Sequence, residues 1–424
     1  MDIVASSRRG MYAWQSSGTP LSGWPYLISP PYNLYFTPSL ADIDNDQKLE
    51  IFGGSEGLQQ LGLSYNGNSL PGWPQQAAGN SFNKPTAIAD VDNNGDSDII
   101  AGTRDQFQYY PAQVYLWNHD GSILPGWPRN VGEIRVESIA VSDLDQDGDG
   151  EIIAADGRKV FVWNQDGTPF GPWPLAPQPD IQVFTGPYGG TYLNSPLGVA
   201  VGDVNNDGNQ DVVVFTYNYA QYEPNKRIWV HAFNANGVEL PNFPVEISGL
   251  FAELRPGIAL AKLDNDDLLE IILTTTQKLV VVKASGAVQS FPQNYPALFG
   301  QIFGAVVANI DNDPERELIS PLSLDNTLGT PEDAIGKIYA WNPDGTILAN
   351  YPLTLPVIPT TMLSIADING DGRPEVAGGY VTYDSSGTVT NSGIYIQKLP
   401  GSSLLWQVEW ATFAHDMQHT NFYP

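Results

Sequence analysis

Short runs of apolar residues alternate with polar turns along the whole chain. Typical runs lie at residues 51–52, 99–100 and 152–153, and each directly follows an acidic residue. No window keeps the 3.6-residue spacing of an amphipathic helix for long. The pattern therefore predicts an all-β protein of short strands joined by many turns, and it argues against a helical solenoid.

An acidic loop recurs seven times in the sequence. Each copy has polar side chains at alternate positions, then a further acid, and then two apolar residues. The copies begin at Asp42, Asp90, Asp143, Asp203, Lys262, Asn309 and Asp367. Successive copies start 47 to 60 residues apart, with the shortest step from 262 to 309 and the longest from 143 to 203. This period is typical of propeller blades, so the loops predict tandem repeats.

Two further elements follow the acidic loops. Three strand-like segments end in a Trp-Asn-x-Asp-Gly turn, at residues 117–121, 163–167 and 341–345. An Asp-Gly pair between apolar runs favours a hairpin because glycine accepts a positive φ without strain. Segments of the Leu-Pro-Gly-Trp-Pro type lie at 70–74 and 124–128, with relatives at 21–25 and 171–174, and their prolines suit an edge strand.

Each repeat thus predicts four short strands, named A to D here. Strand A enters the acidic loop, strand B leaves it, strand C ends at the Asp-Gly turn and strand D contains the Trp-Pro pair. Four antiparallel strands repeated around an axis make a β-propeller. We expect residues 1–424 to form one propeller domain, with repeats starting near residues 35, 84, 136, 196, 255, 302 and 360.

The number of blades follows from the length of the chain. Dividing 424 residues by the repeat spacing favours eight blades, with seven as the alternative. Residues 1–34 contain segments typical of strands B to D but no acidic loop. We expect the C-terminal segment 406–424 to complete this partial blade and to close the ring by pairing the two chain ends, which removes exposed sheet edges.

The acidic loops have the donor atoms of a calcium site. Calcium binds six to eight oxygen ligands, and an Asp-x-Asp-x-Asp-Gly-x-x-Glu loop turns alternate side chains to one side. Glycine at the sixth position, as in Gly95, Gly148, Gly208 and Gly372, permits the sharp turn. Without a cation, the clustered carboxylates would repel one another. The candidate ligands are Asp42, Asp44, Asp46, Glu50, Asp90, Asp92, Asn94, Asp98, Asp143, Asp145, Asp147, Glu151, Asp203, Asn205, Asp207, Asp211, Asn309, Asp311, Asp313, Glu317, Asp367, Asn369, Asp371 and Glu375.

Two copies of the loop depart from this pattern. Lys262 replaces the first aspartate of its loop, and its ammonium group could take the place of the metal by pairing with the acids around it. Asn309 keeps an oxygen ligand without a charge, and Pro314 replaces the glycine of that loop. We therefore expect about five to seven Ca²⁺ ions, with the loop at Lys262 empty.

Composition narrows the functional classes. The net charge is −28, and the 19 basic residues form no cluster, so a nucleic-acid partner is not expected. The absence of cysteine excludes disulfides, thiolate metal sites and cysteine nucleophiles. No apolar run approaches the roughly 18 residues of a membrane span, so no membrane insertion is expected. Residues 1–10 lack the apolar core of a signal peptide, so we expect either a mature or truncated start or a chain that is not exported by that route.

The acidic loops resemble those of the FG-GAP/VCBS repeat family, the calcium-binding propellers of the integrin α-subunit type. The strongest matches are residues 41–46, 142–151 and 202–208. The chain lacks most of the Phe-Gly and Gly-Ala-Pro punctuation of integrins and is more similar to the prokaryotic branch. The resemblance implies structural calcium, an extracellular or cell-surface location, and a role in adhesion, carbohydrate binding or protein assembly. Some secreted polysaccharide lyases use a similar propeller, and a shared fold does not fix activity.

The predicted strand order divides the connections between two faces. The acidic loops and Asp-Gly turns share one face, and the long connections share the other. These long connections are residues 103–112, 176–196, 216–227, 320–336 and 378–393, and several contain tyrosine. Long loops on a rigid scaffold often carry function, so a glycan or protein partner is expected on this face, with self-assembly as a further possibility.

The sequence leaves three functions open. The first is a non-catalytic calcium-binding module for adhesion, binding or assembly, and the absence of a nucleophile elbow, phosphate loop or dinucleotide fingerprint favours it. The second is a secreted polysaccharide lyase, for which Lys226 and Arg227 beside Tyr217 and Tyr222 are the candidate residues. The third is a structural subunit of a filament or surface layer.

Overall fold

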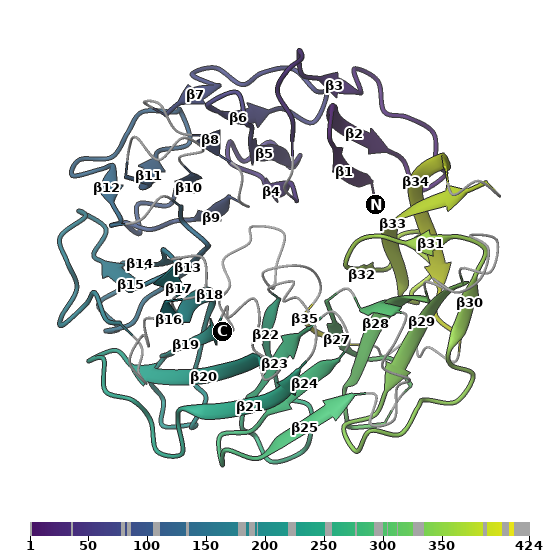
Figure 1. Cartoon of the computed structure of the whole chain (residues 1–424). Coiled ribbons are helices and arrows are strands. Elements are labelled where there is room, and N and C mark those ends of the chain that lie inside the picture. The colour runs from purple at the N-terminus through teal and green to yellow at the C-terminus, as the bar shows by residue number, and fades with distance from the viewer. Residues whose placement is uncertain are drawn as a thin grey trace.

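The computed structural model describes residues 2–34, 37–77, 81–82, 86–104, 111–132, 135–176, 184–185, 191–192, 194–218, 226–250, 257–275, 278–291, 300–302, 304–311, 313–324, 335–384, 388–400 and 407–410. All regular secondary structure in these residues is β, and no helix suited to crossing a membrane occurs among them. The strands form eight antiparallel blades around a central axis (Figure 1). The predicted all-β, eight-bladed propeller is confirmed, and the seven-bladed alternative is wrong.

The first four blades follow one another in chain order. Blade 1 comprises β1 (Ile3–Ser7), β2 (Gly10–Trp14) and β3 (Tyr26–Leu27). Blade 2 comprises β4 (Ser39–Ala41), β5 (Glu50–Gly54), β6 (Gln59–Leu63) and β7 (Gln75–Gln76). Blade 3 comprises β8 (Ser81–Phe82), β9 (Ala87–Ala89), β10 (Asp98–Arg104), β11 (Gln113–Trp117) and β12 (Arg129–Asn130). Blade 4 comprises β13 (Ser138–Ser142), β14 (Glu151–Ala155) and β15 (Val160–Trp163).

The last four blades follow a two-stranded hairpin of β16 (Phe184–Thr185) and β17 (Thr191–Tyr192). Blade 5 comprises β18 (Asn194–Gly202), β19 (Asp211–Asn218), β20 (Lys226–Asn234) and β21 (Val245–Leu250). Blade 6 comprises β22 (Ile258–Ala261), β23 (Glu270–Thr274), β24 (Leu279–Val282) and β25 (Val288–Phe291). Blade 7 comprises β26 (Gly300–Ile302), β27 (Val306–Asn309), β28 (Glu317–Leu324), β29 (Ile335–Trp341) and β30 (Leu353–Leu355). Blade 8 comprises β31 (Ile358–Pro359), β32 (Ser364–Ala366), β33 (Glu375–Tyr383) and β34 (Val389–Lys398).

The strands of each blade follow one order from the axis to the rim (Figure 1). Among the described residues, blade 1 has no strand A, and blades 4 and 8 have no regular strand D. In blades 3, 7 and 8, strand A is split into two pieces that pair with the same strand B. Strand B is apolar on both faces because each blade packs between two neighbours. Ile152 joins the core shared with blade 3, and the next residue, Ile153, joins the core shared with blade 5. The apolar runs of the sequence are therefore strands buried on both faces.

The Trp-Pro segments of blades 1 to 4 each form a contact with the next blade, which is called the clasp here. The indole Nε1 of Trp127 in blade 3 donates to the backbone oxygen of Gln165 in blade 4, at 2.8 Å. The ring of Trp127 packs edge-on against Trp163, with 5.9 Å between the ring centroids. The prolines lie in the turn ahead of strand D, with β12 beginning directly after Pro128, so the expected edge-strand role of these prolines is wrong. The turn lies outside the ladder because it reaches the neighbouring blade.

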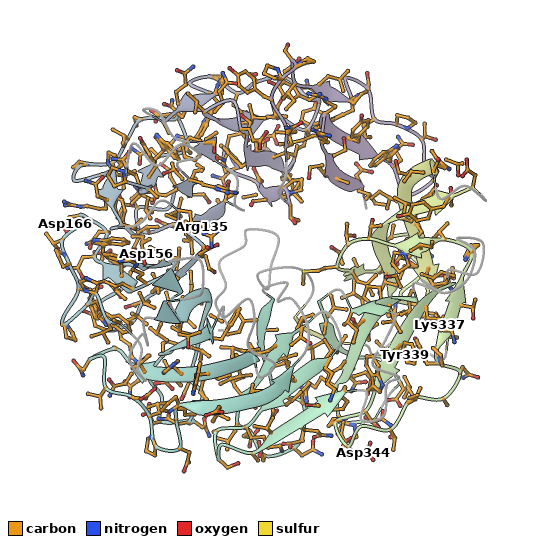
Figure 2. All side chains as sticks on the ribbon, viewed as in Figure 1. Arg135, Asp156, Asp166, Lys337, Tyr339 and Asp344 are labelled. Carbon is orange, nitrogen blue, oxygen red and sulfur yellow. The ribbon has the colours of Figure 1, made fainter. Side chains whose placement is uncertain are left out.

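A glycine in this clasp is required by the close approach of two blades. Gly126 has a φ of 89°, and a Cβ on it would lie 2.0 Å from the backbone oxygen of Asp166 in blade 4. Asp166 lies at the outer rim of the ring (Figure 2), where its Oδ1 accepts a hydrogen bond from the backbone nitrogen of Thr168 at 2.8 Å. A side chain at position 126 would therefore strain the backbone and push the two blades apart.

The C-terminal strand joins a different blade from the one expected. Strand β35 (Gln407–Trp410) pairs with β27 of blade 7, with Trp410 opposite Val307. Among the described residues, β1 pairs only with β2, so the expected pairing of the two chain ends is not found there. The inner edge of β27 offers unpaired backbone donors and acceptors, which an added strand satisfies. Residues 411–424 lie outside the described residues.

Several of the expected long loops are extensions of strands B and C. In blade 8, β33 and β34 stay paired up to Tyr383 and Val389, and in blade 7, β28 and β29 stay paired up to Leu324 and Ile335. The expectation of loops is wrong for these parts because pairing satisfies backbone groups that a loop would leave open. The intervening residues 105–110, 177–183, 186–190, 219–225, 325–334 and 385–387 lie outside the described residues.

Candidate metal centres in the acidic loops

The seven acidic loops each connect strand A to strand B. In every loop the last acid is the first residue of strand B, where it is buried. These terminal acids are Glu50, Asp98, Glu151, Asp211, Glu270, Glu317 and Glu375. Each exposes only 0 to 2 % of its surface. An ionised carboxylate is costly to bury unless hydrogen bonds or a cation compensate its charge. Each loop must therefore provide such a partner for its terminal acid.

One oxygen of each terminal acid is satisfied by the loop itself. The backbone nitrogen of Leu144 donates to Oε2 of Glu151 at 2.7 Å, and that of Val91 donates to Oδ2 of Asp98 at 3.0 Å. The equivalent bond exists in all seven loops. The second oxygen is buried and has no hydrogen-bond partner in Asp98, Asp211, Glu270 and Glu317. These loops therefore hold a carboxylate oxygen that is removed from water and free to bind a cation.

Backbone amides fix the first aspartate of the intact loops. Both oxygens of Asp143 accept bonds, from the nitrogen of Asp147 at 3.1 Å and that of Gly148 at 3.0 Å. Gly148 has a φ of 99°, the left-handed conformation that the sequence predicts for the sixth position. The same pair of bonds forms on Asp42, Asp90, Asp203 and Asp367. The loops are thus shaped by backbone bonds before any ion is considered.

Five loops bring three carboxylates together closely enough for one ion. In each group, single oxygens of the three residues lie within 4.8 Å of one another. The groups are Asp42, Asp44 and Glu50; Asp90, Asp92 and Asp98; Asp143, Asp145 and Glu151; Asp264, Asp266 and Glu270; and Asp311, Asp313 and Glu317. The loops at 203–211 and 367–375 have asparagine in the third position, so their third donor is an amide oxygen. All these donors are hard oxygen atoms, which fit a divalent ion such as Ca²⁺.

Burial raises the pKa of six terminal acids. The pKa rises to about 7 for Glu50, Asp98, Glu151, Asp211 and Glu270, and to about 8 for Glu317. The backbone hydrogen bond opposes this rise, and the neighbouring loop acids add to it by repulsion. Near neutral pH these loops therefore hold a proton with unusual strength, and a bound cation would compete with that proton.

In the loop that begins at Lys262, the ammonium group that contacts the acids belongs to another residue, Lys283. Lys283, which follows β24, contacts Oδ2 of Asp264 and lies 3.8 Å from Oε1 of Glu270. Burial is the largest influence on the pKa of Asp264 and acts to raise it, but the hydrogen bonds from Lys283 and Asp266 and the charge of Lys283 together lower the pKa. The described ion pairs of this loop thus come from Lys283, and the expected pairing of Lys262 is wrong. Position 262 lies on the connection from strand A, whereas strand C delivers Lys283 directly opposite the terminal acid.

The last acidic loop also has a lysine beside it, which the sequence did not indicate as functional. The Nζ of Lys398 lies 2.6 Å from Oδ2 of Asp371 and 3.8 Å from Oε1 of Glu375. The register pairs Lys398 with Glu375. Sequence reasoning could have found both lysines by aligning strand C with strand B, because the residue three positions ahead of the turn glycine faces the terminal acid.

The loop at 309–317 departs from the others in its first position. The Nδ2 atom of Asn309 donates to the backbone oxygen of Asp313. The backbone nitrogen of Asp313 in turn donates to Oδ1 of Asp311 at 3.2 Å. The carboxylates of Asp311, Asp313 and Glu317 still converge. The asparagine therefore closes the turn, while three acids remain available to an ion.

The structure does not describe several of the side chains expected on the opposite face. The side chains of Tyr217, Tyr222, Lys226 and Arg227 are not among the described ones. The same holds for the aromatic residues of the connections at 105–110 and 186–190. A glycan or protein partner on this face and the lyase candidates therefore stay predictions.

Fold and loops together define an eight-bladed β-propeller with acidic loops able to hold metal ions. A family model described as the FG-GAP-like repeat matches residues 90–154 and again residues 143–214. The chain therefore carries FG-GAP-like repeats, and the resemblance predicted from its loops is confirmed. A comparison with curated proteins found no match.

Solved structures of similar fold include proteins of different kinds. The V. cholerae biofilm matrix protein Bap1 has 12 % identity and a TM-score of 0.45, with 99 % of this chain and 88 % of that chain covered. BBS1N in complex with ARL6DN has 10 % identity and a TM-score of 0.46, covering 91 % and 99 %. A Bacillus licheniformis rhamnogalacturonan lyase has 12 % identity and a TM-score of 0.36, covering 95 % and 90 %. No inference about ligand or activity follows from these similarities.

Proposed function

We propose that this chain is an extracellular calcium-binding propeller that acts as a binding, adhesion or assembly module, with calcium in a structural role. The observation that carries the proposal is the terminal acid of the acidic loops. It is buried, and in four loops one of its oxygens has no hydrogen-bond partner. A divalent cation would compensate this buried charge and would join strand A to strand B in each blade that has an intact acidic loop.

The donor atoms favour calcium over other metals. The loops offer carboxylate, amide and backbone oxygens, while zinc sites use cysteine or histidine and the chain has no cysteine. Magnesium prefers a compact octahedron with several waters, whereas a nine-residue loop with up to four acidic or amide side chains suits the larger coordination number of calcium. The ligands would be the alternate acids and amides of each loop together with its terminal acid. Calcium sites of extracellular modules have dissociation constants of about 10⁻⁴ to 10⁻³ M, which fits the proposed location.

The face opposite the acidic loops is the proposed recognition surface. The extended pairs β28–β29 and β33–β34 lengthen their blades toward this face. At the end of the β33–β34 pair, Tyr383 and Val389 expose 41 % and 51 % of their surface. Exposed apolar and aromatic side chains on a rigid hairpin suit a glycan or a protein partner. The calcium ions would hold the scaffold and would not contact that partner.

Equilibrium dialysis against calcium tests the metal part of the proposal. We expect several ions per chain, retained against an equal concentration of magnesium. A chain that binds no calcium in the millimolar range would contradict the proposal. The recognition part is tested with a glycan array and with sedimentation at rising protein concentration. We expect binding or self-association that is lost in chelator. Cleavage of acidic polysaccharides would contradict the binding-module proposal and would favour an enzyme.

A further inference from the structure

One position on strand C faces the terminal acid of every acidic loop. The register places Asn234 directly opposite Asp211, and Lys398 directly opposite Glu375. Residues that face each other in this way on an antiparallel pair have Cβ atoms about 4.5–5.5 Å apart. Continuing each register by one residue gives the same relation in the other blades. The facing position is Ser64, Asn118, Asn164, Asn234, Lys283, Asn342 and Lys398 in blades 2 to 8.

Asparagine at the facing position satisfies its own hairpin turn. The Nδ2 atom of Asn164 donates to Oγ1 of Thr168 at 2.8 Å, and that of Asn342 donates to Oγ1 of Thr346 at 2.9 Å. The side chain brings no positive charge to the acidic loop. The buried terminal acid of such a blade must therefore find its cation in solution.

Lysine at the facing position behaves differently. In blades 6 and 8 its ammonium group contacts an aspartate of the loop and lies 3.8 Å from the terminal acid. Both lysines thus lie at the same distance from the terminal acid, although Lys283 contacts the third position of its loop and Lys398 the fifth. In these blades a cation is already tethered to the protein.

We propose that the facing position decides which cation each acidic loop holds. Asparagine or serine leaves the loop to calcium, Lys283 is the permanent cation of blade 6, and Lys398 is a displaceable cation that competes with calcium in blade 8. The proposal rests on calcium binding by the intact loops.

The loop of blade 6 lacks the first ligand of the calcium pattern, although its other three carboxylates converge. Its first position is Lys262, so the two backbone bonds that fix the first aspartate elsewhere have no acceptor. Asp267 takes a φ of 62° where four other loops have glycine. The buried Oε1 of Glu270 has no hydrogen-bond partner, and the Nζ of Lys283 is the cation that faces it. Lys283 therefore completes this loop in the way an ion would complete the others.

The loop of blade 8 fits calcium, which makes its lysine a competitor. Asp367 accepts the full set of backbone bonds, including 3.0 Å from Asp371 and 2.8 Å from Gly372. The side chain of Lys398 is 68 % exposed, against 36 % for Lys283. An exposed ammonium group leaves an ion pair at little cost because water solvates it. This loop should therefore fill last as calcium rises.

The direct test transfers the lysine to an intact loop. In Asn164→Lys, we expect the loop of blade 4 to become like that of blade 8, so that native mass spectrometry at limiting calcium counts one ion fewer than in wild type. Asn164→Ser is the matched control, because serine occupies this position in blade 2, and it should keep the wild-type count. A wild-type chain without calcium would overturn the proposed function. A wild-type chain with calcium and an Asn164→Lys variant with the same count would overturn this inference alone.

Two lysine variants test the native sites. Lys398→Met should tighten the weakest calcium site about tenfold, as expected when one like charge is removed from beside a divalent ion, and Lys398→Arg should not. Lys283→Met should lower the melting temperature equally in calcium and in chelator, because no ion replaces the lost ammonium group. An unchanged affinity in Lys398→Met, or an unchanged melting temperature in Lys283→Met, would contradict the proposal.

Discussion

The acidic loops of blades 4 and 6 share a backbone plan and differ in how the buried acid is compensated. Glu151 and Glu270 both begin strand B, both are about 1 % exposed, and each accepts a backbone bond from the start of its loop. In blade 4 the residue facing the acid is Asn164, and the loop has a complete set of acids. In blade 6 it is Lys283, and the first acid is missing. In both blades strand B fixes the buried acid, and on the proposed account the facing residue of strand C determines which cation compensates it.

Removing calcium should have the largest effect and should act differently on blades 4 and 6. At about 100 times its dissociation constant, calcium adds about 2.7 kcal/mol for each independent site. With several sites, we expect the melting temperature to fall on the order of 10 °C in chelator. Hydrogen exchange should then rise in residues 143–155 and stay unchanged in residues 262–274. Equal loss of protection in both segments would contradict the difference between the two blades.

Neutralising one terminal acid at a time should give a smaller and more local effect. Glu151→Gln removes a calcium ligand and also removes the repulsion in the empty loop. We expect it to lower the calcium-dependent gain in unfolding free energy by about 2.7 kcal/mol at the same calcium excess. Glu270→Gln is its matched partner and should leave the calcium-dependent gain as in wild type. Calorimetric melting with and without calcium measures both, and a reduced gain in Glu270→Gln would argue for an ion in blade 6.

The pH dependence of the melting temperature of the calcium-free protein should show how the buried terminal acid affects stability. Burial raises the pKa of Glu151 from 4.5 to about 7 in the folded chain. A raised carboxyl pKa contributes stability that is complete below pH 4.5 and is lost as the pH rises through about 7. In chelator we therefore expect the melting temperature to fall between about pH 5 and pH 8. Excess calcium should flatten this slope, and a melting temperature that rises over this range in chelator would contradict the assignment.

The clasp between blades should give the smallest effect. Trp127 donates to Gln165 beside the loop of blade 4, whereas the equivalent Phe243 has no donor. Next to it, Nδ2 of Asn242 donates to the backbone oxygen of Ala284 at 3.2 Å. We expect Trp127→Phe to lower the unfolding free energy by about 1 kcal/mol, the net value of one hydrogen bond. Phe243→Trp should bring no comparable gain in urea unfolding, because Asn242 already holds that turn.

The sequence predicted those features that depend on local chemistry. Alternating acids located the loops, the sixth-position glycine of blade 4 has the expected positive φ, and the repeat spacing gave eight blades. Features that depend on contacts between distant strands were missed. The ammonium group was assigned to Lys262 inside the loop, although the register delivers Lys283 from strand C. The role of Trp127 and the pairing of β35 with β27 likewise depend on neighbouring blades, which a single repeat does not reveal.

The central claim is that intact acidic loops hold calcium while Lys283 takes its place in blade 6. A crystal structure grown in calcium, with an anomalous difference map, tests it directly. The account predicts peaks in the loops at 42–50, 90–98, 143–151 and 203–211. It predicts no peak between Asp264 and Glu270, with the Lys283 ammonium group at that place. A peak in the blade 6 loop, or empty loops in blades 2 to 5, would contradict the account.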